Sequence, residues 1–286
     1  SQFHSVLVEK CSMSTALKKY EPQEFAALDP QSPAKRAFEA NIGEEGFSMS
    51  DLIRVKMPSG GGLIWTIDGA AGPEATQSID GVLVFQARNG VLWPSQEPAD
   101  DSKPVVDTID MKVGRIRGEI KRDESGVIIG ISTATDPEMV KTIAQHEIKD
   151  ASGKGTGTVD WNALPYTQFG TGKGGHGKFA KEGRVLFILR KGSVLPLMLR
   201  TGPSAVGIMK KFLTQMELPY WHCVVSLTLK EEKSNGGQKY SAPVPRVIGQ
   251  LPPEAIETIE KSYKGPLEMA WNAGRIVDAG EEAAEA

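Results

Sequence analysis

The chain has 286 residues, of which 40% are hydrophobic and 24% charged, so it is long enough to bury a full core. Its two cysteines, Cys11 and Cys223, are too few for a disulfide framework or a four-thiolate zinc site, and no apolar run approaches the ~20 residues that span a bilayer. Residues 1–22 are too polar for a signal peptide, and a reducing, cytoplasmic location is the expectation.

The net charge of −3 conceals a segregation of charge along the chain. Residues 141–240 carry fifteen Lys and Arg against seven Asp and Glu. Residues 1–140 carry fourteen against twenty-one, and residues 241–286 carry four against eight. A basic middle between acidic flanks is typical of a surface that binds a polyanion. A solvated, lysine-rich face explains the same numbers equally well.

The first half of the chain shows short patterns separated by turn residues. Residues 1–47 mix a short helical pattern with proline breaks and indicate an N-terminal arm. Strand patterns follow at 52–58, 63–67 and 81–87, and a proline-bearing loop covers residues 93–107. Residues 110–132 alternate as a hairpin does, and residues 138–149 favour a helix.

The second half gives the clearest patterns. Residues 184–190 (RVLFILR) and 194–200 (VLPLMLR) predict a hairpin that turns at residues 191–193, with the alternating VLFIL segment in the core. Residues 202–216 predict a helix with an apolar stripe that packs in the core. Strands at 220–230 and 240–249, short helices within 251–272 and an acidic tail at 278–286 complete the chain.

Closely spaced hairpins without regular β-α-β units predict a strand-rich α+β fold. The expected form is an OB-like small barrel or a curled antiparallel sheet, with a helix between strands and further helices at the periphery. The chain then divides into an N-terminal arm (1–47), a strand-rich core (48–250) that contains a glycine-rich loop (153–183), and short helices with the acidic tail (251–286).

The glycine-rich loop includes the run GKGGHGKF at residues 172–179, which matches the phosphate-binding motif G-x-x-x-x-G-K up to its last letter. Phe179 stands where a Ser or Thr would hold magnesium, and a strand pattern rather than a helix follows. His222 and Cys223 would point to opposite faces of a strand, and the four histidines lack metal-ligand spacing. A nucleotide-hydrolysing enzyme is therefore the least favoured function, and no catalytic residue, cofactor or metal is predicted.

The same loop suits a polyanion, because glycines let the backbone approach phosphates and aromatic rings offer faces on which unpaired bases stack. The cations expected to track phosphates are Lys173, Lys178, Arg184, Arg190, Lys191 and Arg200. The aromatic side chains expected to stack on bases are Tyr166, Phe169, Trp65 and Trp93. Ordinary core packing is the alternative for each aromatic residue.

Residues 165–216 resemble a family of phage and prophage proteins, mostly uncharacterised, that is associated with single-stranded DNA binding. Its members read glutamine-aromatic-glycine, a Gly/Lys loop, a basic R-x-L-x-x-L-R-x-G-x-x-L-P hairpin and a Pro-Ser-led helix, and further matches extend the resemblance to roughly residues 48–251. The resemblance implies a non-enzymatic, largely sequence-independent single-stranded DNA-binding protein of phage replication or recombination. A homo-oligomer in the bacterial cytoplasm, with a phage recombinase or replication protein as partner, is the expected setting.

One departure from this family concerns a metal. Members commonly carry cysteines around the loop, at positions held here by Trp161, Leu164 and Ala180, so no zinc is expected. The rival hypothesis is a non-enzymatic structural or interaction protein whose basic middle pairs with acidic segments of itself or of a partner.

Overall fold

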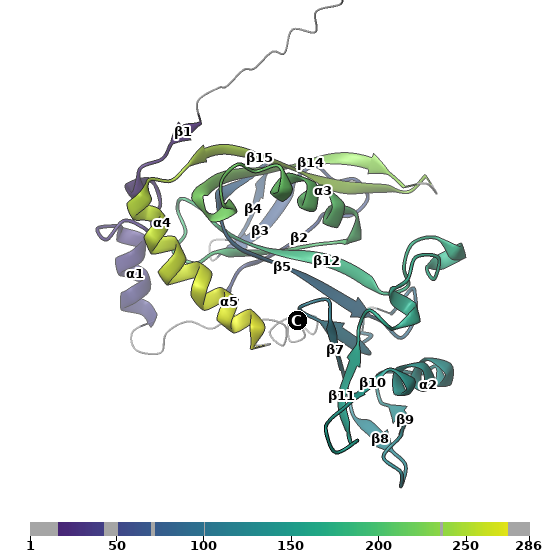
Figure 1. Cartoon of the computed structure of the whole chain (residues 1–286). Helices are drawn as coiled ribbons and strands as arrows, with labels where there is room; N and C mark the ends of the chain where they lie inside the picture. The colour runs from purple at the N-terminus through teal and green to yellow at the C-terminus, as the bar shows by residue number, and fades with distance from the viewer. Residues whose placement is uncertain (1–16, 43–50, 70–71, 100, 235–236, 274–286) are drawn as a thin grey trace, which may run out of the picture.

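A large mixed sheet of eleven strands lies at the centre of the molecule (Figure 1). The computed structural model describes residues 17–42, 51–69, 72–99, 101–234 and 237–273. β5 (Ile79–Leu92) is the longest strand and organises the sheet. One edge of β5 pairs with β12 (Lys181–Leu189), and the other edge pairs with β14 (Cys223–Lys233) at its start and with β6 (Val106–Thr108) at its end. The sheet therefore forks at β5.

Three branches leave β5. The first runs through β12 and β13 to β2, the second through β14 and β15 to β1, and the third through β6, β7 and β11 to β10. The remaining strands of this sheet are β1 (Lys18–Lys19), β2 (Arg54–Lys56), β7 (Val113–Ile116), β10 (Glu147–Lys149), β11 (Gly155–Asp160), β13 (Leu197–Thr201) and β15 (Lys239–Gln250). Two small hairpin sheets lie beside it: β3 (Trp65–Gly69) with β4 (Gly72–Thr76), and β8 (Ile120–Arg122) with β9 (Ile128–Ile131).

This architecture confirms the predicted strand-rich α+β class, but the described strands form no closed barrel. β1 pairs with β15 and β2 pairs with β13 in parallel, whereas the other pairings are antiparallel. The sheet is therefore mixed rather than wholly antiparallel. These parallel pairs join segments far apart in the sequence, so no local pattern reveals them.

Both faces of the central sheet are buried. In β12, Val185, Phe187 and Leu189 enter one hydrophobic cluster, while Leu186 and Ile188 enter the cluster on the opposite face. This alternation is the period of two that a strand imposes, and it confirms the predicted core position of the VLFIL segment. The β12–β13 hairpin also forms as predicted, although its connection is longer than the expected three-residue turn.

Helices cover both faces of the sheet. α4 (Pro253–Ile259) and α5 (Gly265–Asn272), joined by a π-helical turn at Glu260–Lys264, pack on one face, and α3 (Pro203–Thr214) packs on the other (Figure 1). α3 confirms the predicted helix and buries Met209 in the core. α1 (Pro33–Ile42) belongs to the N-terminal arm, whose described part reaches the core through Tyr20 and Phe25.

A third hydrophobic cluster lies in the branch formed by β6, β7, β10 and β11, together with β8, β9 and α2 (Pro137–Gln145). Figure 1 shows this branch projecting from the end of the main sheet. The glycine-rich loop begins in this branch and returns to β12, so it lies where the branch joins the central sheet. Cys11 and the acidic tail at 278–286 lie outside the described residues. No helix in the described part of the chain is long and apolar enough to cross a membrane.

Candidate nucleic-acid interface

The glycine-rich loop folds back on itself through its own backbone. The backbone N–H groups of Gly170 and Gly172 both donate to the carbonyl of Gly177, at 2.7 and 3.2 Å. Gly174 and Gly177 have φ of 64° and 66°, a conformation that residues with a side chain rarely adopt. The loop leads directly into strand β12, so no helix N-terminus follows its G-K-F sequence. This geometry differs from a phosphate-binding loop, in which a helix N-terminus supplies N–H groups to the phosphates.

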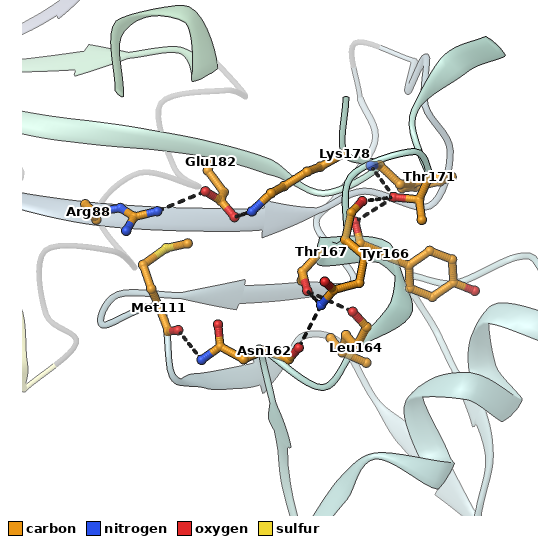
Figure 2. Close-up of polar contacts among 11 residues, drawn as sticks. Arg88, Met111, Asn162, Leu164, Tyr166, Thr167, Thr171, Lys178 and Glu182 are labelled. Atoms are coloured by element: carbon orange, nitrogen blue, oxygen red, sulfur yellow. Dashed lines mark hydrogen bonds and ion pairs between the residues drawn. The ribbon is translucent and has the colours of Figure 1, made fainter. Parts of the chain in front are cut away.

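Side-chain hydrogen bonds fix the loop to the branch beneath it (Figure 2). The Thr171 hydroxyl donates to the Gln168 carbonyl at 2.7 Å, and Gln168 Nε2 donates to the Asn162 carbonyl at 3.0 Å. Asn162 Nδ2 in turn donates to the Met111 carbonyl at 3.0 Å. Because each link uses a short polar side chain, the loop has a defined shape although it is rich in glycine.

Phe169 is the most exposed large hydrophobic residue of the described chain, with 82% of its surface accessible. The ammonium of Lys178 lies 5.2 Å from the centre of its ring, within the range of a cation–π contact. Tyr166 is half-buried and packs against Phe179, with ring centres 5.2 Å apart. An aromatic face and a cation therefore stand side by side on the surface of the loop.

The other two aromatic candidates lie elsewhere. Trp65, on β3, is fully buried, and its indole N–H donates to the Leu227 carbonyl at 2.9 Å. The expectation that Trp65 stacks on bases is therefore wrong, because neither face of its ring reaches solvent. Trp93 is half-buried just after β5.

Four of the six predicted cations form ion pairs with glutamates. Lys173 pairs with Glu97, and Lys178 donates to Glu182 at 2.6 Å, while Arg88 donates to the other oxygen of Glu182 at 2.9 Å (Figure 2). Near the β12–β13 turn, a second set of two pairs forms: Arg190 with Glu74 at 2.6 Å and Lys191 with Glu24 at 2.5 Å. Each of these four cations therefore already has a carboxylate partner, which a phosphate would have to displace.

Arg190 and Glu74 stabilise each other's charge. Hydrogen bonds from Arg190 hold the pKa of the Glu74 carboxyl below its usual 4.5, and the same bonds raise the pKa of Arg190. An incoming phosphate would have to displace this bidentate partner. By contrast, Lys173 and Glu97 are both about three-quarters exposed, so solvent and salt screen their pair and a phosphate can replace the carboxylate.

The last two predicted cations, Arg184 and Arg200, lie within the sheet. Arg184 is only 8% exposed and donates to the side chain of Gln86, so it does not lie on the surface as expected. Burial lowers the pKa of Arg184, and the neighbouring charge of Arg88 lowers it further. Arg200, on β13, is half-buried.

Three arginines that the sequence did not single out lie in the same part of the fold: Arg54, Arg115 and Arg117. Arg54 on β2 lies 61 residues before Arg115 on β7, and Arg117 directly follows β7, so only the pairing within the large sheet brings these strands together. The sequence gives one signal for this group of arginines. Arg54 is a basic residue at a core-facing position of the strand pattern LIRVKMP.

The positions at which the resembled family carries cysteines are apolar and close together. Trp161, Leu164 and Ala180 are each at most 2% exposed and belong to the hydrophobic cluster beneath the loop. Apolar packing therefore supports the loop at these three positions. Within the described residues, no group of three or more His, Cys, Asp or Glu side chains is arranged to hold a metal ion.

Comparisons of the chain with protein-family models, with curated proteins and with solved structures gave no significant match. The likeness to the phage family therefore stays a prediction.

Proposed function

We propose that this chain is a non-enzymatic protein that binds single-stranded DNA with little sequence preference. The observation that carries the proposal is the exposed ring of Phe169 beside the ammonium of Lys178, on a loop that packing and hydrogen bonds hold in place. Exposure of the apolar Phe169 ring to water is unfavourable. A base that stacks on the ring would remove this unfavourable exposure.

The surrounding groups support a single strand as the ligand. Unpaired bases present π faces to an exposed ring, whereas the bases of a duplex are stacked on one another. Lys173 and His176 are exposed on the same loop and can approach the phosphates that flank a stacked base. The expected OB-like character is part of this proposal. It means here that an open, forked sheet carries the loop proposed to bind DNA at its junction.

The test of this proposal is the affinity for a fluorescently labelled oligothymidylate, measured by anisotropy. Phe169→Ala is expected to weaken binding by about 1–3 kcal/mol, or roughly five- to 150-fold, because one stacking face is lost. Met269→Ala is the matched control, since Met269 is 68% exposed on α5, away from the loop. Equal affinities for the wild type and Phe169→Ala would move the stacking site elsewhere, and no binding by the wild type would refute the proposal.

The setting of this activity belongs to the same proposal. Phage DNA replication or recombination in the bacterial cytoplasm, homo-oligomerisation, and a recombinase or replication protein as partner all follow from the family likeness. Co-elution with a candidate partner in the presence and absence of oligonucleotide would test the last of these.

A second function is favoured by the internal ion pairs. Lys173, Arg190 and Lys191 of the basic middle pair with Glu97, Glu74 and Glu24 of the acidic first half. An interaction protein whose opposite charges pair within the chain or between copies would show the same contacts. Under this alternative, folded protein binds no oligonucleotide at low salt, and its oligomeric state changes with ionic strength.

A further inference from the structure

Arginines from different strands converge on one region of the central sheet. β2 and β13 run in parallel with Arg54 opposite Met198 and Lys56 opposite Arg200. Met198 belongs to the hydrophobic cluster covered by α4 and α5, so Arg54 and Arg200 project to this same face. We name Arg54, Arg115, Arg117 and Arg200, together with Asp107, the arginine cluster.

Asp107 on β6 is the acidic member of the arginine cluster. Its side chain is 6% exposed, Arg117 Nε donates to its Oδ2 at 2.8 Å, and Arg115 Nε lies 3.4 Å from its Oδ1. Arg200 lies within electrostatic reach of the same carboxylate. Burial lowers the pKa of Arg200, the charge of Arg54 lowers it further, and the charge of Asp107 raises it.

Within the described residues, no carboxylate forms an ion pair with Arg54 or Arg200. Asp107 carries one negative charge and forms ion pairs with both Arg115 and Arg117. The Nε atoms of Arg54 and Arg200 are buried, and neither has a hydrogen-bond partner in the described part of the chain. A buried donor without an acceptor costs free energy, and two arginines close together repel each other. An anion that binds here would remove both costs.

We propose that the arginine cluster binds a phosphate group through Arg54 and Arg200, with Asp107 keeping Arg115 and Arg117 in place beside them. A phosphate carries negative charge on several oxygens that accept hydrogen bonds in different directions, so it can contact guanidinium groups from separate strands. This inference deepens the proposed function and rests on it for the source of the phosphate, which would be a diester group of the bound single strand. A free phosphate offers the same chemistry, so the experiment has an arm for each source.

The first arm measures the unfolding temperature in sodium phosphate and in sodium chloride of matched ionic strength. Phosphate is expected to raise the unfolding temperature of the wild type more than that of the double variant Arg54→Gln/Arg200→Gln, because a ligand stabilises only a fold that binds it. Arg246→Gln makes the same kind of charge change at an exposed position of β15 and should respond as the wild type does. An equal phosphate effect on the wild type and the double variant would overturn the inference.

A double variant that failed to fold would also show no response to phosphate. The unfolding temperature measured in chloride controls for this outcome. In chloride the double variant should unfold at the wild-type temperature or above, since it removes two half-buried charges that repel each other. The variant Arg200→Lys keeps the positive charge but loses the planar guanidinium group with its several N–H donors. Phosphate should therefore raise its unfolding temperature by only part of the wild-type increase. A full phosphate effect in Arg200→Lys would count against a contact made by the guanidinium group.

The second arm measures the affinity of the same proteins for labelled oligothymidylate over a range of salt concentrations. The affinity of the double variant should be lower by about tenfold or more. The slope of log affinity against log salt concentration should become shallower by about 0.7 for each phosphate contact that is lost. If it loses the phosphate effect but binds the oligonucleotide as the wild type does, the site holds a free phosphate instead. If the wild type binds no oligonucleotide but shows the arginine-dependent phosphate effect, the proposed function fails while the arginine cluster remains a phosphate site.

Discussion

Phe169 and Trp65 are both large aromatic residues, and their neighbours give them opposite roles. Trp65 lies on β3 with Ile67 two residues later, and both side chains are buried in the same cluster. Phe169 lies in a loop whose following residues are glycines and lysines, which offer it little apolar surface to pack against. Trp65 therefore stabilises the fold, and Phe169 is available to a ligand.

This difference predicts that two substitutions have separate effects. Trp65→Phe should lower the free energy of unfolding by about 2 kcal/mol, because the Leu227 carbonyl loses its indole donor inside the core. Its affinity for single-stranded DNA should not change. Phe169→Ala should change stability by less than about 0.5 kcal/mol and should weaken DNA binding. Denaturant unfolding and anisotropy on both variants measure the two effects, and a shared loss of stability and binding would contradict the assignment.

At the scale of elements, the chain's local patterns predicted the β12–β13 hairpin, α3 and the long strands β14 and β15. Each has a hydrophobic period that its own residues display, such as the alternation of Val185 to Leu189. The fork at β5, the parallel β2–β13 pair and the arginine cluster could not be predicted. They depend on pairings such as β2–β13 and β5–β14, whose partner residues are 142 to 148 positions apart, and a sequence pattern carries no signal for such pairings. Ion pairs with Glu74 and Glu97 escaped prediction for the same reason.

The projecting branch offers a stability prediction of its own, because Arg122 on β8 and Glu147 on β10 join two sheets. Arg122 donates to both carboxylate oxygens of Glu147, at 2.6 and 2.9 Å, and Glu147 also accepts from the Gly157 N–H at 2.8 Å. Glu147→Gln is expected to cost about 2 kcal/mol, the usual size of hydrogen bonds to a buried charge. Glu138→Gln is the control, because the Glu138 side chain is 77% exposed. Equal stabilities for the two variants would show that the pair does not hold the branch.

The same pair predicts a pH dependence. The hydrogen bonds from Arg122 hold the pKa of Glu147 below its usual 4.5. A carboxyl whose pKa is lower in the folded than in the unfolded state contributes stability above the unfolded value and loses it as the pH falls through the folded value. The stability difference between the wild type and Glu147→Gln should therefore be largest above about pH 4.5 and shrink in more acidic buffer. Denaturant unfolding over this range measures it, and a difference that grows on acidification would contradict the pairing.

At the scale of the whole molecule, the segregated charges of the sequence meet one another in the fold. Carboxylates of the acidic first half face cations of the basic middle, so the surplus of positive charge in that middle is partly neutralised at the surface. The proposed function assigns two places to the polyanion, the exposed loop and the arginine cluster. Both lie near the end of the central sheet where the third branch begins, so one extended strand could contact both.

The decisive measurement is the binding of labelled single-stranded oligonucleotide to the folded wild-type protein, followed by anisotropy from low to moderate salt. We expect saturable binding of the single strand and weaker binding of a duplex of the same sequence. The logarithm of the affinity should fall linearly with the logarithm of the salt concentration, by about 0.7 for each phosphate contact. Folded protein that binds no single strand even at low salt, or that prefers duplex DNA, would contradict the proposed single-stranded DNA binding.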